Sequence, residues 1–347
     1  MPETSHAVPR RLARLALTLP LVATLGACGS PSGRSQPALV LYSGQHPTTT
    51  AALVTAFELQ TGIQVQVRSN DEDVLADQIV EEGSASPADL IYTENSPALE
   101  YLQSRSLLAT VPAGTLARVP ARFSSPQSKW VGVSARVSVL VYNTQLLRKN
   151  QLPTSVMSLA QSRWRGLVGI APAETDFQPI VSSIAQRYGH GAALRWLEGM
   201  AANAGPHSYP DDETLTARVN TGQIAVAIIN QYYWYRLRAE VGASQLHSAL
   251  AFFAPHDPGY VLDVSGAAVL RASKDKAAAD RFLAFLVSDR GQEILARGDS
   301  FEYPLAPGIP ARRGLPPLTT LEPAPLSIAQ LGDGASAVNL LRLAQLL

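Results

Sequence analysis

Cysteine is almost absent from this chain of 347 residues, in which Cys28 is the only example. A single cysteine excludes an intramolecular disulfide and any zinc or iron–sulfur site built from several thiolates. An excess of charge of one sign is also absent, because 28 basic residues are balanced by 28 acidic ones. Nucleic-acid binding needs a basic patch or stripe, so the composition gives no electrostatic case for that class of partner.

The N-terminal region lacks a membrane-spanning segment. Its apolar stretch from Leu15 to Leu25 follows three arginines and is too short to cross a bilayer. This pattern is typical of an export signal that is removed from the mature protein. We therefore expect residues 1–27 to be a signal peptide.

The apolar stretch ends in Leu25-Gly26-Ala27-Cys28, which resembles the lipobox of a bacterial lipoprotein. We expect the thiol of Cys28 to carry a lipid that holds the protein at the membrane. Residues 28–37 contain Ser, Gly and Pro and are expected to form a flexible tether.

Strand and helix patterns alternate from Ala38 onward. The expected strands are Ala38–Tyr42, Ile63–Val67 and Asp89–Tyr92, with helices at Thr48–Thr61 and Asp71–Glu82 between them. This order predicts an α/β fold with a parallel sheet, helices on both faces, and ligands beyond the carboxyl ends of the strands. His46 follows the first strand and Glu94 follows the third, so both are expected at that edge.

Further strands are expected in the second half of the chain, at Val137–Tyr142, Leu167–Ala171, Ile224–Ile229, Tyr260–Val264 and Ala267–Leu270. The chain is expected to cross into a second lobe near the first of these strands and to return around Ser265-Gly266. This division assigns residues 38–137 and 265–313 to lobe 1. It assigns residues 138–264 and 314–347 to lobe 2.

Two adjacent tyrosines follow the apolar run Ile224–Ile229, which is typical of a buried strand of a parallel sheet covered on both faces. Asn230 is a good helix N-cap, which would place Tyr232 and Tyr233 in the first turn of a helix. The positive end of the helix dipole lies there and favours phenolate over phenol. The pair could therefore act as anionic oxygen ligands, or the aromatic stretch could simply form a core cluster.

His46, Glu94, Tyr232 and Tyr233 are the candidate metal ligands. One neutral imidazole, one carboxylate and two phenolates supply three negative charges, which balance a trivalent cation. This set differs from the His and Cys sets of zinc and the carboxylate and carbonyl cages of calcium. Because phenol has an unperturbed pKa of about 10, it ionises at neutral pH only beside a strongly acidic metal. Ferric ion is such a metal.

Several motifs carry a resemblance that extends over most of the chain from Ala38. They are Ser43-Gly44-Gln45-His46, Tyr92-Thr93-Glu94-Asn95, Asn230-Gln231-Tyr232-Tyr233-Trp234, Ser265-Gly266-Ala267 and Glu302-Tyr303-Pro304. In this order they resemble the periplasmic ferric-ion-binding proteins of bacterial ABC iron importers. The resemblance implies a type II periplasmic-binding-protein fold, in which two lobes, each a sheet flanked by helices, are joined by two crossing strands.

The resemblance also implies a function. In that family a histidine and a glutamate from one lobe and two tyrosines from the other hold Fe(3+), and an exogenous anion completes the coordination. It further implies a binding protein, not an enzyme, that delivers iron to an ABC permease and its ATPase. We expect this protein to act as a monomer on the outer face of the cytoplasmic membrane.

The anion site that the resemblance implies is altered here. The corresponding residues are Asn95, Glu174, Thr175, Asp176, Asp212 and Asn230. Three of them are carboxylates, and like charges at close range disfavour a polyanion. We expect phosphate to bind weakly, or carbonate, citrate or water to replace it. Alternatively these acids are solvated or only cap helices, with Thr175 or Asp176 capping a helix from about Phe177.

Two other functions are alternatives. The same two-lobe fold hosts receptors for small organic or oxyanion ligands, such as thiamine, a phosphonate or a polyamine. The same ligand set could also serve a secreted iron enzyme, because an open coordination position permits redox or Lewis-acid chemistry. No additional base, nucleophile or cofactor motif supports the enzyme.

Overall fold

The computed structural model describes residues 38–347. The expected signal peptide, the tether and Cys28 lie outside the described residues. Within residues 38–347, no helix combines the length and the apolar character needed to cross a membrane.

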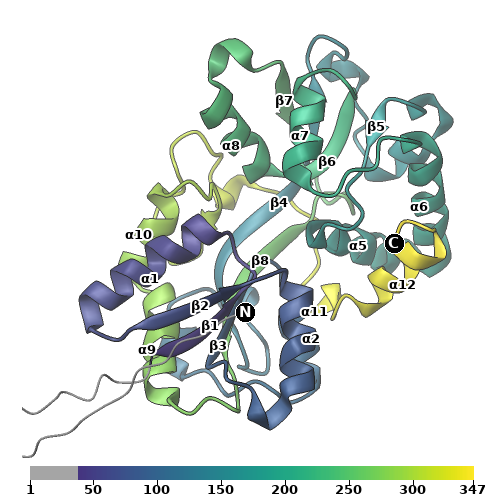
Figure 1. The fold of residues 1–347 in the computed structure, drawn as a ribbon. Helices are drawn as coiled ribbons and strands as arrows, with labels where there is room; N and C mark the ends of the chain where they lie inside the picture. The colour runs from purple at the N-terminus through teal and green to yellow at the C-terminus, as the bar shows by residue number, and fades with distance from the viewer. Residues whose placement is uncertain (1–37) are drawn as a thin grey trace, which may run out of the picture. The chain divides into compact units, whose positions relative to one another are not determined.

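The first half of the described chain alternates strands and helices (Figure 1). Its main elements are β1 (Leu39–Ser43), α1 (Pro47–Thr61), β2 (Val65–Ser69), α2 (Glu72–Glu82), β3 (Leu90–Thr93), α3 (Pro97–Ser104), α4 (Ala113–Leu116) and β4 (Val131–Asn143). The five elements expected between Ala38 and Tyr92 are all present, with ends shifted by at most two residues. The helix α1 ends where Gly62 adopts a left-handed conformation at φ 73°.

The second half begins with a lobe rich in helices and then returns to the first sheet. Its elements are β5 (Val168–Gly169), α5 (Gln178–Tyr188), α6 (His190–Ala204), α7 (Asp212–Asn220), β6 (Val226–Asn230), α8 (Gln231–Val241), β7 (Ser248–Ala251), β8 (Leu262–Val269), α9 (Lys276–Leu286), α10 (Asp289–Arg297), β9 (Tyr303–Pro304), α11 (Ile328–Leu331) and α12 (Ala335–Leu343).

The strands form one hydrogen-bonded sheet in the order β2-β1-β3-β8-β4-β6-β5, with β7 and β9 also paired to β4. The pairs of β1 with β2 and with β3 are parallel, as expected. The strand β6 was expected in a parallel sheet, but it is parallel only to β5 and antiparallel to β4. β4 and β8 also run antiparallel to each other where they pass between the two lobes. The sheet is therefore mixed.

Helices cover both faces of the first lobe's sheet. α1 packs with α9 and α10, whereas α2 packs with α3. Figure 1 shows these two groups on opposite sides of β1, β2 and β3. In the second lobe, α5, α6 and α12 pack together, and α7 and α8 pack on β4 and β6.

Both crossing strands are longer or more continuous than expected. β4 begins at Val131 rather than Val137, although Ser134 and Arg136 interrupt its apolar pattern. Both polar side chains are buried and both contact Glu302, so the strand can continue through them. β8 is a single strand rather than two, because Ser265 is buried and donates a hydrogen bond to the carbonyl of Thr93.

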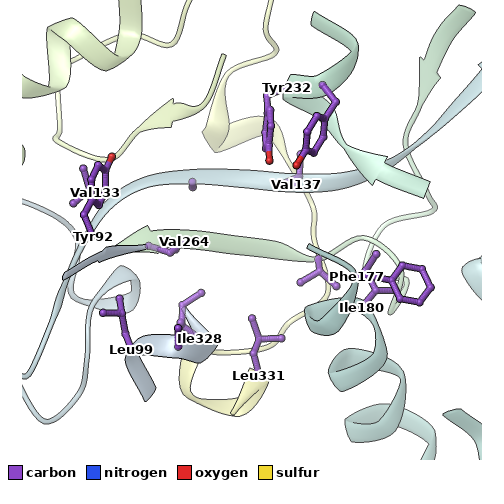
Figure 2. Close-up of a cluster of buried hydrophobic side chains, with 14 of the residues drawn as sticks. Tyr92, Leu99, Val133, Val137, Phe177, Ile180, Tyr232, Val264, Ile328 and Leu331 are labelled. Atoms are coloured by element: carbon purple, nitrogen blue, oxygen red, sulfur yellow. The ribbon is translucent and has the colours of Figure 1, made fainter. Parts of the chain in front are cut away.

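The side chain of Gln231 fills the place where β4 changes partners. The backbone N–H of Val137 donates to Gln231 Oε1 at 2.8 Å, and Gln231 Nε2 donates to the carbonyl of Phe301 at 3.0 Å. From Ser138 onward β4 pairs with β6, whereas residues 131–137 pair with β8. Buried apolar side chains line β4 up to this point, including Val133 and Val137 (Figure 2).

Gly266 of β8 lies in a space that has no room for a side chain. A Cβ atom there would lie 2.7 Å from Leu99 Cδ1 and 3.0 Å from Trp130 Cε3. Gly266→Ala is therefore expected to lower the free energy of unfolding by about 1–3 kcal/mol, measured by urea denaturation. Gly114→Ala is the control, because a Cβ at that helical position meets no atom within 4 Å. Equal losses in both variants would contradict this explanation.

Candidate functional site

The four candidate ligands lie at strand ends and helix starts. His46 is the N-cap of α1, three residues after the end of β1, and Glu94 directly follows β3. Tyr232 and Tyr233 occupy the first turn of α8, directly after β6, as predicted. Asn230 is the N-cap, but its side chain makes no capping hydrogen bond.

The structure brings all four side chains together. His46 Nε2 lies 2.7 Å from Glu94 Oε1, and the hydroxyl of Tyr232 lies 2.7 Å from the same oxygen. The ring of Tyr233 packs 4.1 Å from that of Tyr232 and 6.3 Å from that of His46, between centroids. Figure 2 shows Tyr232 extending from α8 toward β4. The imidazole and carboxylate of one lobe thus meet the phenols of the other.

Solvent is largely excluded from this group. The side chains of His46 and Glu94 are 12% and 10% exposed, and Tyr232 is fully buried. Burial alone would raise the pKa of Glu94, but His46 and Arg136 together lower it to about 2. Burial alone would lower the pKa of His46. The Glu94 carboxylate has the larger, opposite effect, so the pKa of the imidazole is raised. These two residues form an ion pair inside the site.

The phenols are held in their neutral form. Burial raises the pKa of Tyr232 and of Tyr233 well above the usual value, and the carboxylates of Asp176 and Glu94 raise it further. The expectation that the helix dipole favours phenolate is therefore wrong for the site without a cation, because burial and two nearby carboxylates outweigh the dipole. Ionisation of these tyrosines requires a strong positive charge beside them.

Arg136 is a site residue that the sequence reasoning missed. It lies in the middle of β4, is fully buried and forms an ion pair with Glu302. Its Nη1 atom lies 3.6 Å from Glu94 Oε1 and 3.5 Å from Asp176 Oδ1. The available signal was an arginine inside an apolar strand, because a buried charge needs charged or hydrogen-bonding partners.

Three of the six residues expected at the anion site contact one another. Asn95 Nδ2 donates to Asp176 Oδ1 at 2.8 Å and to Thr175 Oγ1 at 3.2 Å. Neither Thr175 nor Asp176 caps α5, whose N-cap is Phe177, so that expectation is wrong. Instead, Asp176 Oδ2 lies 2.8 Å from the hydroxyl of Tyr232, because the short 3₁₀ turn from Thr175 to Phe177 directs it into the site.

The remaining three expected residues lie around this group. Burial raises the pKa of Glu174 to about 9, and Asp176 and Glu94 add to the shift. The pKa of Asp212 is raised well above its usual range, first by burial and then by Glu174 and Asp176. Asn230 is buried at the end of β6. Asp212 is therefore buried and is not the cap of α7, whose N-cap is Asp211.

A zinc-like or calcium-like cluster is not found in the described part of the chain. No group of three or more His, Cys, Asp and Glu side chains among residues 38–347 is arranged to hold a metal ion. The candidate site differs because phenol oxygens join one imidazole to the carboxylates. Such oxygens are hard donors and suit a cation of high charge.

Comparisons with known proteins agree with this architecture. A family model described as bacterial extracellular solute-binding protein matches residues 85–316. The Fe(3+)-binding periplasmic protein of Serratia marcescens is 35% identical over 307 residues, covering 88% of this chain and 90% of the relative. Relatives with these names are binding proteins rather than enzymes.

Two solved structures share the fold over 89% of this chain and 99% of each neighbour. Iron-bound HitA from Pseudomonas aeruginosa aligns with a TM-score of 0.84 and 40% identity. The Trichodesmium protein in complex with iron and citrate ligands aligns with a TM-score of 0.77 and 27% identity. The predicted two-lobe α/β fold is thereby confirmed. This chain belongs to the bacterial extracellular solute-binding protein family, and the resemblance to the periplasmic ferric-ion-binding proteins inferred from its sequence motifs is confirmed.

Proposed function

We propose that this protein captures a ferric ion between its two lobes, with His46, Glu94, Tyr232 and Tyr233 as ligands. The observation that carries the proposal is the convergence of His46 Nε2 and the Tyr232 hydroxyl on one oxygen of Glu94, each at 2.7 Å. The names of the relatives, which include iron-bound and Fe(3+)-binding proteins, support the choice of metal.

Ferric ion fits the charge of this site. Glu94 and two phenolates carry three negative charges, and the imidazole adds a neutral donor. Binding must remove the phenol protons, which burial and the neighbouring carboxylates hold firmly. A weakly acidic divalent ion would do this less well, so the buried phenols favour a small trivalent metal.

The ligands divide between the lobes, which gives a reason for closure. We take lobe 1 as residues 38–137 with 265–313 and lobe 2 as residues 138–264 with 314–347. His46 and Glu94 belong to the first, and the tyrosines belong to the second. Because neither lobe supplies enough ligands alone, the metal stabilises the closed state relative to an open one.

Delivery and anchoring complete the proposal. The closed, iron-containing protein would act as a monomer and present its cargo to an ABC permease driven by a cytoplasmic ATPase. A lipid on Cys28 would hold it at the outer face of the cytoplasmic membrane. Among soluble anions, phosphate is disfavoured as a co-ligand because the carboxylate of Asp176 lies in its expected place, beside Asn95.

Tyr232→Phe and Tyr233→Phe are each expected to abolish the visible charge-transfer band of the iron-containing protein, because the band requires phenolate bound to ferric ion. Absorption spectra and iron content of the purified variants measure this. Tyr235→Phe is the matched control, since this tyrosine is in the same helix but donates to the carbonyl of Gly314. A wild-type protein that stays colourless with ferric salt would instead favour a receptor for an organic or oxyanion ligand.

Acid is expected to release the iron. The phenol pKa values are raised in the folded protein, so falling pH returns protons to both tyrosines and weakens binding. The logarithm of the affinity should rise with pH by about two to three units per pH unit between pH 6 and 8, one for each phenol and up to one for the imidazole of His46, whose pKa Glu94 raises. Iron retained after gel filtration against a competing chelator measures this, after correction for the chelator's own protonation. Binding independent of pH would show that the phenols are not ligands.

Cys28→Ser is expected to move the protein from the membrane fraction to the soluble fraction of cells, because no acyl group can be attached to serine in place of the thiol. Immunoblots of the fractions measure this. Ser30→Ala, two residues further on, should leave the protein with the membranes. An unchanged distribution of the Cys28→Ser variant would refute the anchor.

A further inference from the structure

Asp176 occupies an unusual position in the site. One of its carboxylate oxygens, Oδ2, lies 2.8 Å from the hydroxyl of Tyr232. The same hydroxyl lies 2.7 Å from Glu94 Oε1. The phenol oxygen of a proposed ligand is therefore flanked by one carboxylate from each lobe. Glu94 is itself a proposed ligand, and Asp176 lies at nearly the same distance from the Tyr232 hydroxyl.

The other oxygen of Asp176 is fixed in place. Oδ1 accepts a hydrogen bond of 2.8 Å from Asn95 Nδ2 and lies 3.5 Å from Arg136 Nη1. Asp176 is 4% exposed and Arg136 is fully buried. Because Asn95 and Arg136 hold Oδ1, the carboxylate presents Oδ2 to the site in a defined orientation.

Little in the neighbourhood is left to attract an anion from solution. Arg136 already forms an ion pair with Glu302 and faces both Glu94 and Asp176. Arg236, at the rim beside His46, lies 3.3 Å from Glu213 Oε1. The two arginines next to the proposed ligands are thus engaged by carboxylates of the protein.

We propose that Asp176 takes the part of the soluble anion and supplies an oxygen ligand to the bound metal, so that iron binding needs no synergistic anion. This inference rests on the proposed ferric site. His46, Glu94 and the two phenolates supply four donor atoms, and Asp176 adds one or two oxygens, because a carboxylate binds through either one oxygen or both. The phenol oxygen of Tyr232 links Asp176 to Glu94, so the metal would replace the proton they share.

Asp176 would add one negative charge to the site. Glu94 and the phenolates already neutralise a trivalent ion, so the charge of Asp176 relies on the guanidinium of Arg136, which it shares with Glu302. An exogenous phosphate would add a further anion without a free cation to receive it. A carboxylate that belongs to the chain is positioned by folding and loses no translational freedom when the metal arrives.

The test compares iron binding with and without soluble anions. Iron-free wild-type protein is mixed with ferrous chloride under argon in buffer free of carbonate, phosphate and citrate, and oxygen free of carbon dioxide is then admitted to oxidise the iron. We expect one iron per chain and a visible absorption band without any added anion. Adding phosphate, citrate or hydrogencarbonate should change the iron affinity, measured by chelator competition, by less than twofold. Asp176→Asn should bind iron at least tenfold more weakly without an anion and should recover when one of these anions is added.

Glu198→Gln is the matched control, because it removes an exposed acidic charge of α6 and leaves the carboxylate partners of Arg136 and Arg236 in place. It should remain independent of soluble anions. A wild-type band that forms only after an anion is added would overturn the role of Asp176 and leave the iron site standing. Absence of the band under every condition would overturn the iron site itself. If Asp176→Asn does not fold, as judged by circular dichroism, the wild-type result decides the question alone.

Discussion

The site depends on one buried positive charge. Arg136 lies in the strand that crosses between the lobes, and the carboxylates of Glu302, Glu94 and Asp176 gather around it. An unpaired guanidinium in this position would be strongly destabilising, so its partners must come to it. Because those partners come from the segment after β3, from the turn before α5 and from the segment before β9, one residue helps to orient segments of both lobes around the proposed site.

A second constraint is the neutrality of the buried phenols. Tyr232 and Tyr233 open a helix, where the local dipole alone would assist ionisation. Their burial beside Glu94 and Asp176 has the larger and opposite effect. The pair therefore stays protonated until a strongly polarising ion is present. Under the proposed ferric site, this conditional ionisation would give a physical basis for discrimination among metals by their charge.

Much of this arrangement could be predicted from the sequence, since the strand-to-helix switches at His46, Glu94 and Tyr232 follow from hydrophobic periodicity and turn residues. The sequence reasoning failed where tertiary contacts override local pattern. Arg136 and Ser134 resemble a break in an apolar strand, yet Glu302 satisfies both, about 170 positions further along the chain. Asp176 resembles a helix cap, and only the fold shows that its carboxylate meets Tyr232. Long-range pairing of polar groups leaves no local signature.

The hydrogen bonds of Gln231 have a mechanical consequence. This residue directly precedes Tyr232, and its side chain joins the N–H of Val137, where β4 passes from one lobe's pairing to the other's, to the carbonyl of Phe301. The side-chain amide of Gln231 therefore links the first turn of α8 to β4 at Val137 and to the segment at Phe301. Under the proposed closure, a rotation that carries the tyrosines away from Glu94 would strain these two hydrogen bonds, so opening of the lobes would be coupled to loosening of β4 at Val137.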